Sequence, residues 1–300
     1  GLLGYNNGGS IDNSHFTGSV AASGGYSYSY FGGLVGYSTG AISNSYTDVT
    51  LSADSTDNLS VHYPCGLVGS HGGNLSESHT TITMNSFTTS GTDVGTSNLG
   101  GLAGGMKNGA ISNCFVEGNI QLFKTHTNDN AHFTGGLVGY STYSNSISNS
   151  HFSGSLLGSD NIGGLIGYSS VSSATVSISK SYSTGTITGR GGYVGGLIGE
   201  HSGSGSISNS YSTATISSGY YTGGLVGKGD GLSISDSHYI GTLSGGSGSY
   251  VGGLAGYLTG SISNSYAEGA VPGGSNTGGL VGYISGLVSN SHHIGDVSST

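Results

Sequence analysis

Apolar residues recur along the chain in short segments that are separated by glycine and serine. One segment, Gly-Leu-Val-Gly or a close variant, occurs ten times at intervals of 26 to 35 residues. A second segment, Ile-Ser-Asn-Ser-Tyr/His or a variant, follows each copy, and a third apolar position comes next. The segments show no 3.6-residue period, so they predict strands and not amphipathic helices.

Each repeat therefore supplies three apolar anchors. The third anchor follows the second by nine residues in eight repeats and by seven in the other two. The first anchors are Leu2, Leu34, Leu67, Leu102, Leu137, Leu165, Leu197, Leu225, Leu254 and Leu280. The second are Ile11, Ile42, Leu75, Ile111, Ile147, Ile178, Ile207, Ile234, Ile262 and Val288. The third are Val20, Val49, Ile82, Ile120, Leu156, Ile187, Ile216, Leu243, Val271 and Val297.

A single repeat of this kind cannot bury its own apolar side chains, but stacked repeats can. The sequence thus predicts an all-β fold, a right-handed parallel β-solenoid (β-helix) of ten coils with about three short strands per coil and no helices. Equivalent residues of successive repeats would form interior columns. The predicted core columns are Leu34, Leu137, Leu165, Leu197, Leu225, Leu254, Leu280, Ile42, Ile147, Ile207, Ile262, Ile187, Ile216 and Val271.

Asparagine recurs at the centre of the second segment. Strict alternation would place Ile207, Asn209 and Tyr211 on one side and both serines on the other. Stacked amides one strand spacing apart can bond along the axis, so we expect a polar ladder. Charged residues at the same slot, such as Lys180, indicate that it lies at a corner. The predicted ladder is Asn13, Asn44, Asn113, Asn149, Asn209, Asn264 and Asn290.

Composition excludes several classes of function. Only 6% of residues are charged and the net charge is −9, which does not fit a nucleic-acid partner. No apolar run is long enough for a membrane-spanning helix, so we expect no membrane insertion. Cys65 and Cys114 match no zinc pattern and are expected to be small packing residues.

Ionisable residues do not form a recurring catalytic pattern. We expect no enzyme activity, no cofactor and no metal site. Five histidines fill the slot that tyrosine fills in other repeats, and we interpret them as repeat positions: His15, His79, His151, His238 and His292. Tyrosine follows the first segment in six repeats, and either packs at a corner or forms an outward stripe for glycans or lateral fibre contacts.

The repeat resembles the GLUG motif family, whose pattern is matched closely from Gly253 to Val271. The likeness covers the whole chain. It implies an extracellular or cell-surface repeat region, typically bacterial, of the kind found in large adhesin-like proteins. No catalytic residues belong to the motif, so none are assigned here.

We expect residues 1–300 to form a single β-solenoid domain of ten GLUG-like repeats. Repeats 1–4, about 1–136, would carry long lateral loops, and repeats 5–10, about 137–300, would be compact. The loops Leu51 to Pro64, Thr83 to Asn98 and Gln121 to Thr134 either shield one flank or carry recognition. Their ionisable residues include Asp54, Asp57, His62, Asp93, Lys124, His126, Asp129 and His132.

Both ends of the chain are in repeat phase, which suggests that they are complementary. An open head-to-tail contact generates a filament, here a homopolymer with a step of about 48 Å per subunit. The alternative is a stalk or adhesive segment of a large surface adhesin, and the third reading is a carbohydrate- or ice-binding surface. The predicted head-to-tail interface is Gly1, Leu2, Leu3, Ile11, Val20, Leu280, Val288 and Val297.

Overall fold

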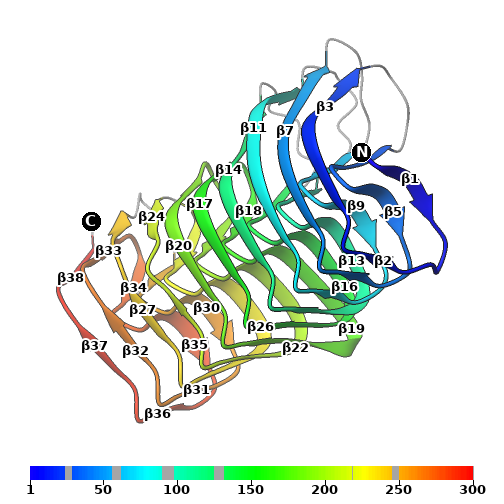
Figure 1. Ribbon diagram of the computed structural model, residues 1–300. Helices are drawn as coiled ribbons and strands as arrows, with labels where there is room; N and C mark the ends of the chain where they lie inside the picture. The colour runs from blue at the N-terminus through cyan, green and yellow to red at the C-terminus, as the bar shows by residue number, and fades with distance from the viewer. Residues whose placement is uncertain are drawn as a thin grey trace.

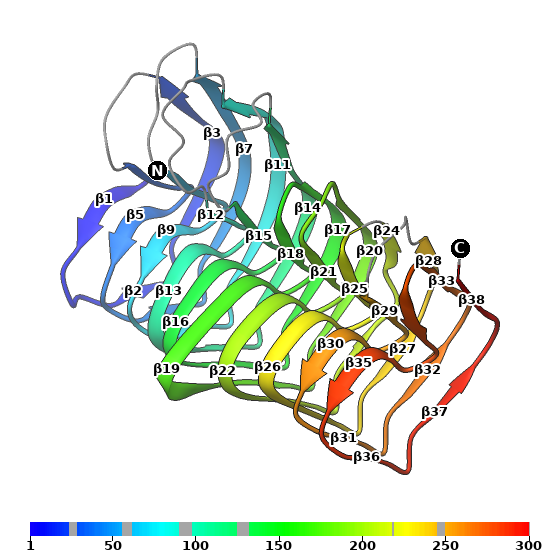
Figure 2. The same cartoon turned by 180° about the vertical axis from the view of Figure 1, so that it is seen from behind.

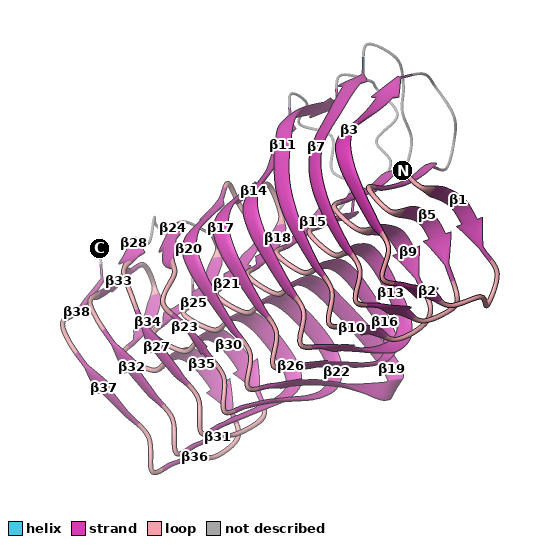
Figure 3. Ribbon diagram, viewed as in Figure 1, coloured by secondary structure: helices cyan, strands magenta, loops and turns pink. Residues whose placement is uncertain are grey.

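The fold is an all-β parallel solenoid in a computed structural model (Figures 1 and 3). The structure describes residues 1–23, 29–55, 62–89, 98–124, 132–217, 219–244 and 250–299, and none of these residues is helical. Every strand pair in it is parallel, and each strand lies beside its equivalents in the neighbouring repeats. The right-handed sense stays a prediction.

Sheet 1 contains the strands that follow each Gly-Gly-Leu element (Figure 2). Its path is β1 (Leu3–Asn6), β5 (Val35–Ser38), β9 (Val68–His71), β13 (Ala103–Ser112), β16 (Val138–Ser148), β19 (Ile166–Ser179), β22 (Ile198–Ser208), β26 (Val226–Ser235), β30 (Ala255–Thr259) and β35 (Val281–Ser285). Beside this path lie β2 (Ile11–Asp12), β6 (Ile42–Ser43), β10 (Leu75–Ser76), β31 (Ile262–Ser263) and β36 (Val288–Ser289).

Sheet 2 begins at the tyrosine or histidine that ends the second segment. Its path is β3 (His15–Ser23), β7 (Tyr46–Ser55), β11 (His79–Thr89), β14 (Phe115–Lys124), β17 (His151–Gly158), β20 (Tyr182–Gly189), β23 (Tyr211–Ser212), β27 (His238–Ile240), β32 (Tyr266–Glu268) and β37 (His292–Ile294). It also holds β24 (Thr215–Ser217) and β28 (Leu243–Ser244), and β33 (Val271–Gly273) pairs separately with β38 (Val297–Ser299).

Sheet 3 closes each turn just before the glycine pair. Its strands are β4 (Ser29–Gly32), β8 (His62–Cys65), β12 (Asn98–Gly100), β15 (Phe133–Gly135), β18 (Asn161–Gly163), β21 (Tyr193–Gly195), β25 (Tyr221–Gly223), β29 (Tyr250–Gly252) and β34 (Asn276–Gly278). The solenoid has about seven turns, so the prediction of ten coils overstates their number. The last described repeat adds no strand to sheet 3, whose path ends at β34.

The apolar columns form one continuous core along the axis. Of the predicted core residues, all are buried except Leu280, which is partly buried against the same core in the last repeat. The second anchors are in strict register, since Ile42 pairs with Leu75 and Leu75 with Ile111. Water is therefore excluded by the same positions in each repeat.

The third anchors need a correction in two repeats. Val49 pairs with Gly18, and Ile82 pairs with Gly118, so neither lies in the column of Ile120. Val20 pairs instead with Leu51, and Leu51 with Met84. The seven-residue spacing had selected a residue two positions too early, which lies on the same face of the strand because the side-chain period is two.

The glycine pairs mark the tight approach between sheet 3 and sheet 1. A Cβ atom on Gly196 would lie 2.0 Å from the carbonyl oxygen of Gly224 in the next repeat. Side chains are therefore excluded at this corner by backbone packing between coils.

Sheet 2 is wider in the first four repeats. Figure 1 shows β3, β7 and β11 extending beyond the body of the solenoid. The start of the long predicted loops thus continues sheet 2, with Met84 opposite Leu51. Asp57, Asp93, His126 and Asp129 lie outside the described residues, whereas His132 is buried.

Candidate functional surfaces

The corner between sheets 1 and 2 is made by the central residue of the second segment. Asn209 and its equivalents have φ between 47° and 54°, the left-handed region that asparagine tolerates better than most residues. Glu77, Lys180 and Asp236 adopt the same conformation at this slot. The corner assignment is confirmed, but the alternation is wrong, because a left-handed residue rotates the chain and exposes its own side chain.

The predicted asparagine ladder is not the buried polar ladder of the fold. Asn44 donates to Asp12, and Asn113 donates to Glu77. Among the described residues of this set, a single amide-to-amide hydrogen bond is formed, from Asn290 to Asn264 at 3.3 Å. The side chains of the asparagine slot are exposed, so water also satisfies them.

The buried ladder is formed by the serine that follows the asparagine. In Ser181, the hydroxyl donates to the Ser179 carbonyl at 2.8 Å and accepts from the Ser150 backbone N–H at 3.2 Å. The other members make the same two bonds: the one to the carbonyl, at 2.7–2.8 Å, lies within a repeat, and the one from the N–H, at 3.1–3.2 Å, joins it to the neighbouring repeat. Sequence reasoning missed it, although serine recurs at this position in nine of the ten repeats. Its members are Ser45, Ser78, Ser150, Ser181, Ser210, Ser237, Ser265 and Ser291.

A ladder of stacked rings runs the full length of sheet 2. Neighbouring ring centroids are 4.5–5.5 Å apart. The histidines that we interpreted as repeat positions all lie in this ladder, which confirms that interpretation. Burial lowers the pKa of His151 and His238, which favours their neutral form. The rings are His15, Tyr46, His79, Phe115, His151, Tyr182, Tyr211, His238, Tyr266 and His292.

A second aromatic surface, which we call the tyrosine face, covers the corner between sheets 3 and 1. From sheet 1 it contains the predicted Tyr5, Tyr37, Tyr140, Tyr168, Tyr257 and Tyr283. From sheet 3 it contains Tyr30, Tyr63, Tyr193, Tyr221 and Tyr250, which sequence reasoning missed. A tyrosine two residues before the glycine pair was the available signal.

The tyrosine face packs at a corner and also forms a stripe along the axis, whereas its contacts with glycans or other fibres stay a prediction. Its rings stack along the axis, and rings of the two sheets also meet edge to face, as Tyr250 and Tyr257 do at 5.9 Å. Most are half-buried, while Tyr5 and Tyr283 at the two ends are exposed. Because stacked rings cover one another's faces, the surface presents ring edges and phenol hydroxyls to solvent.

A small charged cluster interrupts the tyrosine face. Lys228 forms ion pairs with Glu200 at 3.1 Å and Asp230 at 3.2 Å, and its ammonium lies 5.4 Å from the Tyr193 ring centroid. Burial alone would lower the pKa of Lys228, but the bonds and charges of Glu200 and Asp230 raise it above its usual range. The cluster thus keeps a fixed positive charge beside two carboxylates.

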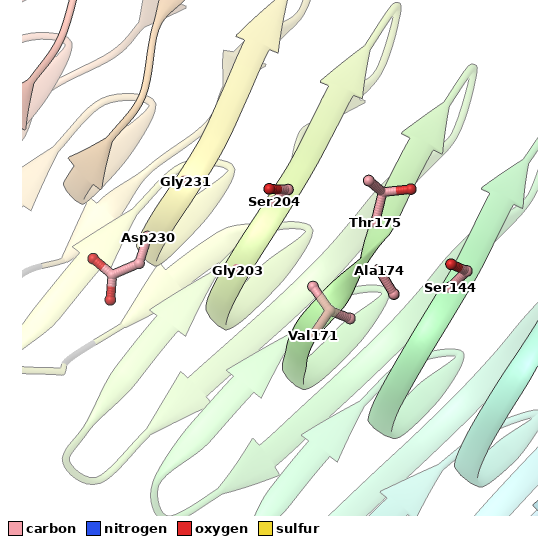
Figure 4. A pocket seen from close by; sticks show the side chains of 8 residues that line it. All are labelled: Ser144, Val171, Ala174, Thr175, Gly203, Ser204, Asp230 and Gly231. Carbon is pink, nitrogen blue, oxygen red and sulfur yellow. The ribbon is translucent and has the colours of Figure 1, made fainter.

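A shallow groove of about 620 Å³ crosses the bend of sheet 1 from β16 to β26. Figure 4 shows Ser144, Thr175 and Ser204 on successive strands, with Asp230 at one end. Val171 and Ala174 supply its apolar lining. A neighbouring hollow of about 300 Å³ shares Ser144 and Thr175, so the two form one hydroxyl-lined path along the axis.

The interior also contains ionisable side chains that the repeat pattern did not reveal. His71 and His201 lie in one inward-facing column with Ser38, Met106 and Ser169. Burial lowers the pKa of His71 to about 4, so the ring is neutral at pH 7.

Cys65 and Cys114 are free and buried, as expected of packing residues. Burial raises the pKa of the Cys114 thiol to about 12, which leaves it protonated at pH 7. Within the described ranges, no three His, Cys, Asp or Glu side chains gather as metal ligands would. Nor do those ranges hold a helix of the length and apolar character needed to span a membrane.

The GLUG motif model matches residues 190–217 and 247–271 of this chain. The match is limited to these two segments. Both matched segments end at or one residue after a third anchor, Val271 or Ile216, so the matched unit contains strands of sheet 3, sheet 1 and sheet 2. The predicted family resemblance is therefore confirmed.

The chain is also similar to Halomucin of Haloquadratum walsbyi (strain DSM 16790 / HBSQ001). The two are 34% identical over 156 residues, which cover 47% of this chain and 2% of Halomucin. This chain therefore matches a very small part of that protein. The bacterial source stays a prediction, since Halomucin is archaeal. No solved structure matches the chain.

Proposed function

We propose that this GLUG solenoid is an extracellular, non-enzymatic structural module of the cell surface. The observation that carries the proposal is the continuity of its three ladders. Apolar anchors, buried serines and stacked rings each repeat along the axis from the first repeats to the last. Because each repeat packs against its neighbours, such stacking makes a stiff rod. The similarity to Halomucin supports a surface location.

The finer proposal is that copies stack head to tail into a fibre. Both terminal turns expose apolar side chains that are buried elsewhere in the same columns, including Leu3 at one end and Val288 and Val297 at the other. In register, Val288 of one copy would cover Ile11 of the next, and Tyr283 would stack on Tyr5. Unpaired edge strands favour this kind of addition.

Cryo-electron microscopy of the purified chain tests the fibre. We expect filaments with a subunit step of about 48 Å, from ten stacked strands of sheet 1 at about 4.8 Å each. Val288→Asp should abolish them, because it places a carboxylate in the apolar contact. The matched control is Leu287→Asp, at a neighbouring exposed position outside the column. Single rods at every concentration would contradict stacking.

A stalk or adhesive segment of a larger surface protein is the alternative. The match to 2% of a far longer relative favours it, because further repeats would then continue the same columns covalently. Intact mass of the native protein separates the two. A product much heavier than the 29.6 kDa of this chain supports the stalk, and a product of that mass supports the fibre.

Carbohydrate binding is a second candidate function, favoured by the hydroxyl-lined groove. Its polar groups and open shape suit the hydroxyls of an extended glycan more than a compact apolar ligand. Calorimetry with soluble polysaccharides should detect binding that Thr175→Val weakens and Thr186→Val, on an exposed part of sheet 2, does not. Equal binding by both variants would remove the groove from consideration.

A further inference from the structure

Tyrosine pairs of successive repeats are held in a geometry suited to covalent coupling. The ring centroids of Tyr257 and Tyr283 are 4.6 Å apart with planes 8° from parallel, and those of Tyr221 and Tyr250 are 4.9 Å apart at 6°. In both pairs the two residues are direct partners across parallel strands. The paired strands therefore hold the two phenol rings about one strand spacing apart, so the rings need not diffuse together before they react.

These pairs are also accessible to an oxidant. Tyr283 is 43% exposed, and Tyr221, Tyr250 and Tyr257 are half-buried, so each side chain is partly open to solvent. Exposure matters because two stacked rings must rotate until their edges meet before a bond can form between them. Cys65 and Cys114 are buried, free thiols, so they provide no disulfide for this chain.

We propose that the stacked pairs of the tyrosine face are sites of oxidative coupling to dityrosine, with Tyr257 and Tyr283 the principal pair. The co-reactant is hydrogen peroxide. A peroxidase uses it to remove one electron at a time from the phenols. Each phenol loses one electron and one proton to give a tyrosyl radical. The two radicals join through their ring carbons ortho to oxygen, and each ring regains aromaticity when its ortho hydrogen moves to the oxygen. One hydrogen peroxide accepts the two electrons and two protons and becomes two waters.

The bridge would tie one turn of the solenoid to the next. Coupling Tyr257 to Tyr283 closes a loop within the last two repeats and restricts the unfolded chain, as a disulfide does. The proposal does not depend on end-to-end stacking, since both rings belong to one chain.

Oxidation of the dilute, folded chain by a peroxidase and hydrogen peroxide tests the proposal. Peptide mapping by mass spectrometry should find a Tyr257–Tyr283 bridge with the loss of two hydrogens. Tyr283→Phe should remove this bridge and leave the Tyr221–Tyr250 bridge, because phenylalanine keeps the stacked ring but lacks the phenol. The ring ladders already accept phenylalanine, as Phe133 stacks on Tyr168 at 4.6 Å.

Two tyrosines outside the stacks provide the matched control. Tyr143 and Tyr220 are 59% and 62% exposed, and neither belongs to a stacked pair among the described residues. Tyr220→Phe should leave both bridges intact, and oxidation in denaturant should abolish the preference for stacked pairs. Coupling that occurs mainly through Tyr143 and Tyr220, or tyrosine oxidation with no bridge at all, would overturn the proposal.

Discussion

The first four repeats and the later ones distribute the same strands differently around the coil. In sheet 2, β3, β7, β11 and β14 are 9 to 11 residues long, whereas β17 and β20 have 8 and the later strands are shorter. Sheet 1 follows a different course. β1, β5 and β9 have 4 residues each, the strands from β13 to β26 have 10 to 14, and β30 and β35 have 5.

The interior columns pass through both regions despite this difference. The ring ladder continues from Phe115 to His151, where the wide repeats meet the compact ones. At the same boundary the Cys114 N–H donates to the Ser150 hydroxyl, so the slot of the serine ladder stays bonded although it holds a cysteine. Strand length outside the columns is therefore free to vary, because added residues meet solvent or their own equivalents. Inside the columns, each residue is fixed by the repeats above and below it.

The largest effect on stability is expected when a charge is placed in the first-anchor column. Leu197→Asp should destabilise the solenoid by several kcal/mol, because Leu197 is fully buried and a carboxylate there would have no partner. Leu2→Asp is the control, since Leu2 is the first anchor of repeat 1 and is 53% exposed. Denaturant unfolding measures both. A Leu197 variant as stable as the Leu2 variant would contradict an inward column.

The second-largest effect on stability is expected at acid pH, through the buried histidines. Burial lowers the pKa of His71 from 6.5 to about 4, so between these values the unfolded chain binds a proton that the folded chain does not. Stability is therefore lost as the pH falls from 6.5 to 4, by about 3 kcal/mol from this group. His71→Met, which copies Met106 in the next repeat, should remove that loss.

The compact region provides the control for acid unfolding. Burial also lowers the pKa of His201, but its Nε2 lies 3.1 Å from the Gly203 carbonyl oxygen. His201→Met should therefore shift the midpoint of acid unfolding less than His71→Met does. Identical midpoints for His71→Met and the unaltered chain would show that another group controls acid unfolding.

Features that recur in every repeat could be predicted from the sequence, whereas features that depend on the backbone conformation could not. Strands, apolar columns and the corner at Asn209 followed from spacing, because those positions recur. The buried serine ladder was missed because alternation through Asn209 was assumed, and its φ of 49° breaks that alternation. His71 could not be found from the pattern, since its column accepts Ser38, Met106 and His201 alike.

A smaller effect on stability is expected from substitutions in the serine ladder, in the compact repeats and in the wide ones. Ser181→Ala removes a buried acceptor and donor and leaves the Ser150 N–H unpaired, so we expect a loss of about 1–3 kcal/mol. Ser179→Ala, at a half-buried hydroxyl of the same segment, is the control. In the wide repeats, Cys114 occupies the ladder slot, and Cys114→Ser should leave stability equal or higher. Thermal unfolding of the three variants decides between these outcomes.

The smallest expected effect concerns the left-handed corner. Lys180 has φ 49°, where asparagine is better tolerated, so Lys180→Asn should raise stability by about 1 kcal/mol or less. Lys180→Gln separates this from the loss of charge, because glutamine gains nothing in the left-handed region. Equal gains in both variants would assign the effect to charge.

In the wide repeats, Glu77→Asn should raise stability less than Lys180→Asn does in the same unfolding measurement. Although its φ is 47°, its carboxylate accepts a bond from the Asn113 amide at 2.6 Å, whereas an asparagine at this slot accepts a longer, neutral bond, as Asn264 does from Asn290 at 3.3 Å.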